Sequence, residues 1–180
     1  VFDGWYYDME CTEEYNLYAD SFNGDLTLYA HWINEEDGIP YTYVVLDDDT
    51  VEIRSYTGHR RYITVPDLIE GKQVSSIGDS AFAGQTRLRE VNLPKYLKKI
   101  GRAAFAECAN LTSIALPGGV TQIGEYAFQN NIRLSAVKLS AGSELTYVGA
   151  FAFSGCTSLR AVDLPASLQE IDGSAFYGAT

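Results

Sequence analysis

The amino-acid sequence is dominated by a repeat of about 23 residues that starts at Ile77. Its signature is the six-residue motif I-G-x-x-A-F, in which Val148 replaces the isoleucine once and Asp172 replaces the glycine once. The motif occupies residues 77–82, 100–105, 123–128, 148–153 and 171–176, so its phenylalanines are 23, 23, 25 and 23 residues apart. A fixed period in this range is typical of solenoid proteins, in which each repeat forms one turn and stacks on the next.

The first four repeats also carry the pattern L-x-x-V-x-L, with Ile114 in place of valine once, which begins six residues after the motif phenylalanine. Apolar residues that alternate with other residues predict a short strand, whose apolar side chains point into the core and whose intervening side chains point outward. Proline follows the strand at Pro94, Pro117 and Pro165. It ends the pairing because it has no N–H group to donate.

The I-G-x-x-A-F motif predicts a corner in each turn. Its glycines are expected either to adopt a positive φ or to allow two backbones to approach closely. Asp172 takes this place in the last repeat, and Asp tolerates a positive φ better than most residues. The A-F pair beyond the glycine is expected to form a short helical or 3-10 turn. The glycines are Gly78, Gly101, Gly124 and Gly149.

Together these patterns resemble the BspA-type leucine-rich repeat of bacterial surface proteins. The resemblance covers residues 63–180 as about five turns, truncated at the C-terminal end of the sequence. It implies an α/β leucine-rich-repeat solenoid that is β-rich, with short helical or 3-10 turns. Residues 38–62 are expected to form a β-hairpin that caps the open end of the core, with strands at Tyr43–Leu46 and Val51–Ile53.

Residues 1–37 resemble the C-terminal half of a Listeria–Bacteroides repeat, also called an InlB B-repeat. The likeness rests on Phe2–Tyr6 and Leu26–Trp32 and implies a fragment of a small β-grasp-like surface module. This stretch is rich in aromatic residues, which are expected to form its core, with a stacking platform for sugars as the alternative. They are Phe2, Trp5, Tyr6, Tyr7, Tyr15, Tyr18, Phe22, Tyr29 and Trp32.

Charge also divides the chain. Residues 1–57 hold 14 acidic side chains and one basic one, whereas residues 58–180 hold 10 acidic and 12 basic ones. This asymmetry predicts two modules. The net charge of −11 disfavours a nucleic-acid partner, because nucleic-acid phosphates are themselves negative. The longest apolar runs are far too short to cross a membrane.

Few residues are suited to catalysis or metal binding. His31 and His59 lack a matching nucleophile and are expected at the surface. The chain is therefore predicted not to be an enzyme and to need no cofactor. Asp47–Asp49 invites a calcium interpretation, because clustered carboxylates suit hard cations. The preferred prediction is a solvated hairpin turn, a position that Asp favours.

The three cysteines do not predict a disulfide framework. Cys108 and Cys156 occupy equivalent places two turns apart, roughly 10 Å by strand spacing and beyond the reach of a disulfide. With Gln85 and Asn131 they are expected to form a buried ladder that hydrogen-bonds to neighbouring turns. Cys11 is predicted to be a lone thiol.

The outward residues of the predicted strands are the candidate partner-binding surface. They form one column of Glu90, Ser113, Ala136 and Ala161, and a second of Asn92, Ala115, Lys138 and Asp163. A locally basic patch is a further candidate for contact with an acidic partner or with the acidic first module, and a solvated face is the alternative. Its residues are Arg87, Arg89, Lys95, Lys98, Lys99 and Arg102.

The resemblance implies a non-catalytic protein-binding or adhesion module of a secreted or cell-surface bacterial protein. Its partner would be a host extracellular-matrix component, such as fibronectin, or another surface protein. The signal and the anchor are expected outside the sequence given. The alternative is a structural spacer that presents another domain of a larger surface protein. The ligand, the oligomeric state and the presence of catalytic domains elsewhere stay open.

Overall fold

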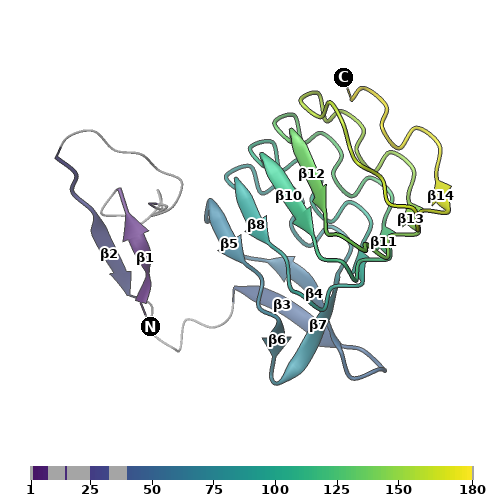
Figure 1. Ribbon diagram of the computed structural model, residues 1–180. Helices are drawn as coiled ribbons and strands as arrows, with labels where there is room; N and C mark the ends of the chain where they lie inside the picture. The colour runs from purple at the N-terminus through teal and green to yellow at the C-terminus, as the bar shows by residue number, and fades with distance from the viewer. Residues whose placement is uncertain (1, 8–14, 16–24, 33–39, 180) are drawn as a thin grey trace.

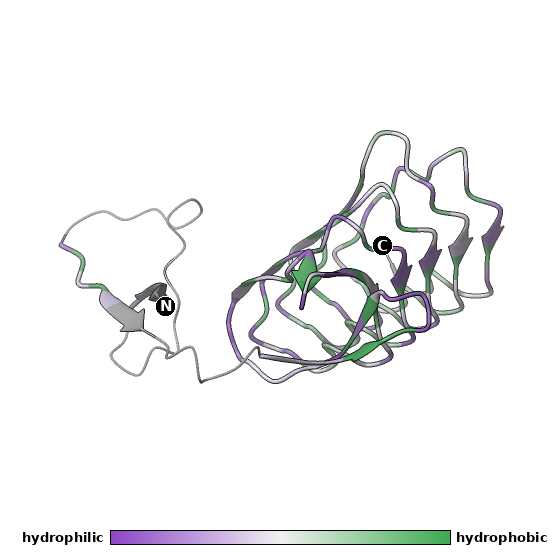
Figure 2. Ribbon diagram, turned by 90° about the horizontal axis from the view of Figure 1, so that it is seen from below, coloured by the Kyte–Doolittle hydropathy of each residue, from purple (hydrophilic) through white to green (hydrophobic). Residues whose placement is uncertain are grey.

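The computed structural model describes residues 2–7, 15, 25–32 and 40–179. Residues 40–179 wind into a solenoid whose successive turns lie side by side (Figure 1). A view turned by 90° shows the same turns one behind another (Figure 2). The solenoid predicted from the 23-residue period is therefore confirmed.

One row of strands follows the L-x-x-V-x-L pattern. Its pairs are parallel and in register, with Ile63 opposite Val91 and Ile114 opposite Val137. These side chains are buried, as the alternation predicts. The row consists of two two-stranded sheets: β5 (Tyr62–Thr64) with β8 (Glu90–Asn92), and β10 (Ser113–Leu116) with β12 (Ala136–Leu139).

A second, eight-stranded sheet runs along the solenoid in the order β14-β13-β11-β9-β7-β4-β3, with β6 paired to β7. The pairs β3–β4 and β6–β7 are antiparallel and the others are parallel. Its strands are β3 (Tyr41–Val45), β4 (Val51–Tyr56), β6 (Leu68–Ile69), β7 (Lys72–Ile77), β9 (Lys99–Ile100), β11 (Gln122–Ile123), β13 (Tyr147–Val148) and β14 (Glu170–Ile171).

The motif phenylalanines form a continuous stack through the core. Phe82, Phe105 and Phe128 are fully buried, and their neighbouring ring centroids lie 4.8 and 5.4 Å apart. Phe153 and Phe176 extend the stack at 5.2 Å per step. Each ring therefore lies against the corresponding ring of the next turn, which explains why one repeat depends on its neighbours for burial.

The motif glycines allow close contact between backbones. A Cβ atom on Gly124 would lie 2.7 Å from the carbonyl carbon of Gly101, and one on Gly149 would lie 2.8 Å from that of Gly124. None of the four motif glycines has a positive φ. Close backbone approach is therefore the alternative that the structure supports, and φ at Asp172 also lies outside the positive range.

The predicted helical or 3-10 turns are not found. After Gly78 the chain forms successive four-residue turns, closed by Ala81 N–H to Gly78 C=O at 3.3 Å and by Ala83 N–H to Ser80 C=O at 3.0 Å. The N–H groups of Ser80 and Phe82 instead donate to the next turn. The positive φ of 57° at Ser80 interrupts any helix. The described residues hold no helix, and so none that could span a membrane.

The predicted hairpin is present at the first turn. Strands β3 and β4 pair with Tyr41 opposite Tyr56, and the ring of Tyr56 stacks on Phe82 at 5.4 Å. The hairpin therefore covers the end of the phenylalanine stack with aromatic side chains. Leu46 N–H donates to Thr50 C=O at 2.8 Å, which closes the turn at Asp47–Asp49.

Near the N-terminus the structure describes one antiparallel pair, β1 (Phe2–Tyr6) with β2 (Tyr29–Trp32). Tyr6 is buried, in line with the core interpretation, whereas Trp5 is 39% exposed. Much of residues 1–37, including Cys11, lies outside the described residues. The β-grasp expectation stays a prediction.

Candidate binding surfaces of the solenoid

The outward residues of β5, β8, β10 and β12, here called the strand face, form the predicted columns. Ser113 pairs with Ala136, and Ala115 with Lys138. Glu90 pairs with Tyr62, an aromatic residue that extends the first column and was not predicted as part of it. The strand periodicity alone contained this signal, because Tyr62 precedes Ile63 as Glu90 precedes Val91.

Most predicted residues of the strand face are accessible. Glu90, Asn92, Lys138 and Asp163 are exposed, and Ser113 is half-buried. Asn92 Nδ2 donates to the Thr64 hydroxyl at 3.2 Å, a cross-strand contact on the outer surface. Ala161 and Asp163 continue the two columns by their place in the repeat, although the chain forms no strand there.

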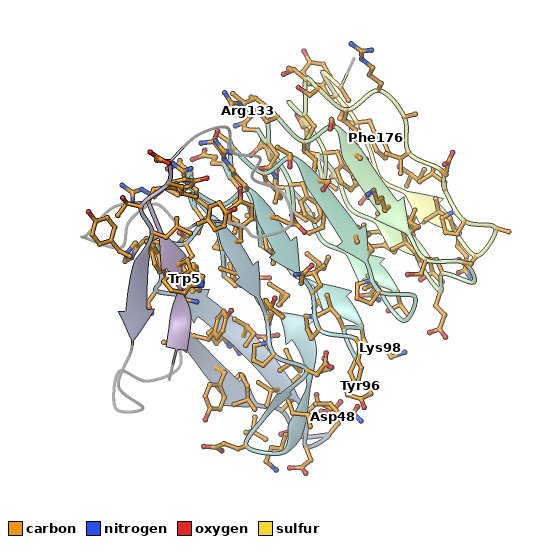
Figure 3. The ribbon with its side chains drawn as sticks, turned by 60° about the vertical axis from the view of Figure 1, so that its left-hand side comes forward. Trp5, Asp48, Tyr96, Lys98, Arg133 and Phe176 are labelled. Carbon is orange, nitrogen blue, oxygen red and sulfur yellow. The ribbon has the colours of Figure 1, made fainter. Side chains whose placement is uncertain are left out.

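The predicted basic patch is divided between the two ends of the strands. Arg87 and Arg89 precede β8, whereas Lys95, Lys98, Lys99 and Arg102 follow it. Figure 3 shows the same division one strand pair further along, because Arg133, which precedes β12, lies away from Lys98. At Lys98 and its neighbours, charge is partly neutralised by acids from other turns, in the ion pairs Lys95–Asp67 at 3.2 Å, Lys98–Glu144 at 3.3 Å and Arg102–Glu125 at 3.6 Å.

The buried cysteine and amide ladder is confirmed at Cys108, Asn131 and Cys156, whereas Gln85 is half-buried, although its Nε2 donates to Tyr56 C=O at 3.3 Å. Cys108 Sγ donates to Phe82 C=O at 3.1 Å, and Cys156 Sγ donates to Phe128 C=O at the same distance. Asn131 Nδ2 donates to Phe105 C=O at 2.9 Å. Burial raises the pKa of Cys108 to about 12 and that of Cys156 to about 11. Both thiols are free and protonated at neutral pH, which suits a structural role rather than a nucleophilic one.

Two of the three hairpin carboxylates have partners, one within the turn and one on β7. Asp48 accepts hydrogen bonds from Thr50 N–H at 3.1 Å and from the Thr50 hydroxyl at 2.7 Å, and these bonds lower the pKa of Asp48. Asp49 pairs with Lys72. Among the described residues, no group of three or more potential ligands is arranged to hold a metal ion. The turn interpretation accounts for all of these contacts.

Sequence reasoning missed an aromatic pair on the outer side of the turns. Tyr126 and Phe151 have positive φ values of 57° and 56°, which bulky side chains rarely adopt. Their rings stack 5.3 Å apart, and the guanidinium carbon of Arg102 lies 5.5 Å from the Tyr126 centroid. Equivalent positions hold the small residues Ser80, Ala103 and Ser174, so only comparison between turns points to this pair.

Comparison with known proteins finds solved structures that are similar to this chain. A leucine-rich repeat protein from T. pallidum is 32% identical, with a TM-score of 0.73 over 77% of this chain and 64% of that one. A leucine-rich repeat protein from Bacteroides capillosus is 28% identical over 74% of this chain and 83% of that one, with a TM-score of 0.47. The pneumococcal vaccine antigen PcpA is 24% identical over 76% and 36%, with a TM-score of 0.60.

No functionally curated protein matches the sequence significantly. The chain spans less than two thirds of the T. pallidum protein. The family described as "BspA type Leucine rich repeat region" matches residues 59–180 in six copies. The match covers about two thirds of the sequence and begins after the β3–β4 hairpin. The chain therefore belongs to the BspA-type leucine-rich repeat family.

Proposed function

We propose that this chain is a non-catalytic binding module of a bacterial surface or secreted protein, and that its strand face contacts a protein partner. The observation that carries the proposal is the pair of in-register parallel sheets β5–β8 and β10–β12, whose outward side chains include the exposed Glu90, Asn92 and Lys138. A continuous, rigid surface of this kind suits an extended partner, because repeat solenoids offer long binding faces. An extracellular or cell-surface location follows from the surface proteins that the repeat resembles.

A structural spacer is the second candidate, and the composition of the strand face favours it. Ser113, Ala115 and Ala136 are small, and Tyr62 is the sole aromatic residue in the two columns. Large aromatic residues and arginines dominate the energetics of most protein interfaces. A spacer needs the rigidity of the phenylalanine stack and nothing from the outward side chains.

Equilibrium binding of the full chain to matrix glycoproteins, mucins and glycans at physiological salt separates the two candidates. The paired variant Asn92→Ala/Lys138→Ala alters the strand face by placing at both positions the alanine that the chain carries at Ala115. Saturable binding that weakens about tenfold or more in this variant supports the binding module.

A variant at the opposite side of the solenoid, Glu125→Ala, serves as the control, since Glu125 is exposed and lies outside the strand face. Absence of saturable binding to every component supports the spacer. Binding that Glu125→Ala weakens as much as the strand-face variant does contradicts the assignment of the partner to the strand face.

A further inference from the structure

The chain segments that lead into the strands of the strand face are basic in a consistent way. They are the equivalent segments 57–61, 85–89, 108–112, 131–135 and 156–160, and we call their common surface the arginine edge. These segments contain no acidic residue and no lysine, yet they hold six of the eight arginines in the sequence. The arginines are Arg60, Arg61, Arg87, Arg89, Arg133 and Arg160.

Hydrogen bonds align these segments across the turns. Arg89 N–H donates to Arg61 C=O at 2.7 Å, Thr112 N–H to Arg89 C=O at 3.1 Å, and Ser135 N–H to Thr112 C=O at 2.9 Å. Arg160 occupies the next place in the same column by the repeat. At roughly 4.8 Å per turn, the charges are spread over about four turns along the edge.

Three guanidinium groups on the arginine edge are exposed and lack an acidic partner among the described residues. Arg89, Arg133 and Arg160 are exposed, and none forms an ion pair within the described part of the chain. Lys95 and Lys98, at the other end of the strands, each pair with a carboxylate. Figure 3 shows Arg133 at this upper edge, away from Lys98. Arg89, Arg133 and Arg160 are therefore the positive charges of the arginine edge that are available to a partner in the described part of the chain.

We propose that the arginine edge binds a linear sulfated polysaccharide. This inference goes beyond the proposed function, because it adds a second class of partner at a surface adjoining the strand face. Guanidinium groups form paired hydrogen bonds with the oxygens of anionic groups, which lysine ammonium groups cannot do with the same geometry. Sulfates that recur along a polymer match arginines that recur along a stack of turns.

The surroundings of the arginines favour a hydrated polymer over a folded protein. Protein interfaces combine arginines with large aromatic or apolar anchors at their centre. Ile132, 50% exposed, is the one large hydrophobic residue described as strongly exposed within these segments. Hydroxyl and amide groups surround the arginines instead: Thr112 Oγ1 and Asn110 Nδ2 bond to carbonyls of the preceding turn. A shallow, polar and cationic edge suits a polyanion that keeps part of its hydration.

The test uses the full chain and heparin as the probe, with binding measured by calorimetry at several salt concentrations. The variant Arg89→Thr/Arg133→Asn/Arg160→Ser introduces the residues that the chain itself carries at Thr112, Asn110 and Ser135 in the same columns. We expect at least about tenfold weaker binding in this variant, and a smaller dependence of affinity on salt. If the triple variant has a lowered melting temperature, the single variant Arg133→Asn replaces it, and we expect it to weaken binding by a smaller factor.

The matched control is Lys95→Gln/Lys98→Gln/Lys99→Gln, which removes the same charge from the other end of the strands. We expect it to change heparin affinity less than about twofold, because its lysines are paired or distant. Equal loss in both triple variants overturns the proposal, since it shows a nonspecific effect of net charge. Absence of heparin binding at low salt also overturns it.

Two further probes distinguish the chemistry. Chemically desulfated heparin should bind much more weakly than heparin, and polyglutamate should not replace it. Comparable binding of polyglutamate overturns the polysaccharide assignment in favour of an acidic peptide. If the strand-face variant Asn92→Ala/Lys138→Ala weakens the binding of a protein partner and the arginine variant does not, the proposed function is preserved. In that case a lack of heparin binding removes only this inference.

Discussion

At the scale of single residues, the motif glycines set how closely the turns approach. We predict that Gly124→Ala destabilises the protein by about 1–3 kcal/mol, because its Cβ would lie 2.7 Å from the Gly101 carbonyl carbon, a backbone atom that can move only with its turn. Gly173→Ala is the control, since its Cβ meets nothing within 4 Å. Urea unfolding of both variants checks the difference, and similar midpoints would contradict the close-packing explanation.

A second residue-scale prediction concerns Asn131. Its Nδ2 donates to Phe105 C=O at 2.9 Å and Phe128 C=O at 3.0 Å, while its buried Oδ1 has no partner. Asn131→Ala should cost about 1–3 kcal/mol, because two carbonyls lose a donor. Asn131→Cys should cost less, since the chain already places cysteine there at Cys108 and Cys156. Chemical unfolding compares the two, and an alanine variant as stable as the cysteine variant would rule out the ladder as a stabilising element.

At the scale of elements, the cysteine ladder predicts a stability that depends on alkaline pH. Burial raises the pKa of Cys108 to about 12 and that of Cys156 to about 11, from 9.0. Between pH 9 and 11 the unfolded chain loses these thiol protons while the folded chain keeps them. The free energy of unfolding should therefore fall as pH rises, by roughly 1 kcal/mol per pH unit for each thiol.

The variant Cys108→Asn/Cys156→Asn isolates this effect, because it keeps the amide that Asn131 provides in the same ladder. Urea unfolding at pH 8, 9, 10 and 11 should show a shallower decline in the variant than in the original chain. Tyr41, whose pKa burial also raises, contributes equally to both proteins and cancels in the comparison. Parallel declines would show that the thiols ionise as readily folded as unfolded.

The elements also show how far the sequence predicts this structure. The strand row follows from alternation in L-x-x-V-x-L, and the buried cysteines follow from their equivalent positions. The turns after Gly78 were predicted as helical because Ser80 and Ala103 do not signal a positive φ as glycine does. The split of the basic patch depends on partners distant in sequence: Lys98 pairs with Glu144, 46 residues away. Such pairings arise because the turns stack on one another, and they cannot be predicted from the residues near each position in the sequence.

At the scale of the whole molecule, the effect of a given substitution on the free energy of unfolding should depend on where the residue lies along the phenylalanine stack. Stability in repeat proteins is close to a sum of terms within turns and between adjacent turns. Phe128 is fully buried between Phe105 and Phe153, whereas Phe176 is partly buried and stacks on Phe153. Truncation of Phe128 removes two interfaces, and truncation of Phe176 removes one.

We therefore predict that Phe128→Leu lowers the free energy of unfolding by about 1–3 kcal/mol, and that Phe176→Leu lowers it by less than half as much. Leucine keeps the site apolar, so the comparison reports ring stacking and fit rather than exposure of a large cavity. Urea unfolding followed by circular dichroism measures both. Equal losses would contradict the prediction, because they would mean that Phe176, which stacks on one ring, contributes as much to stability as Phe128, which stacks on two.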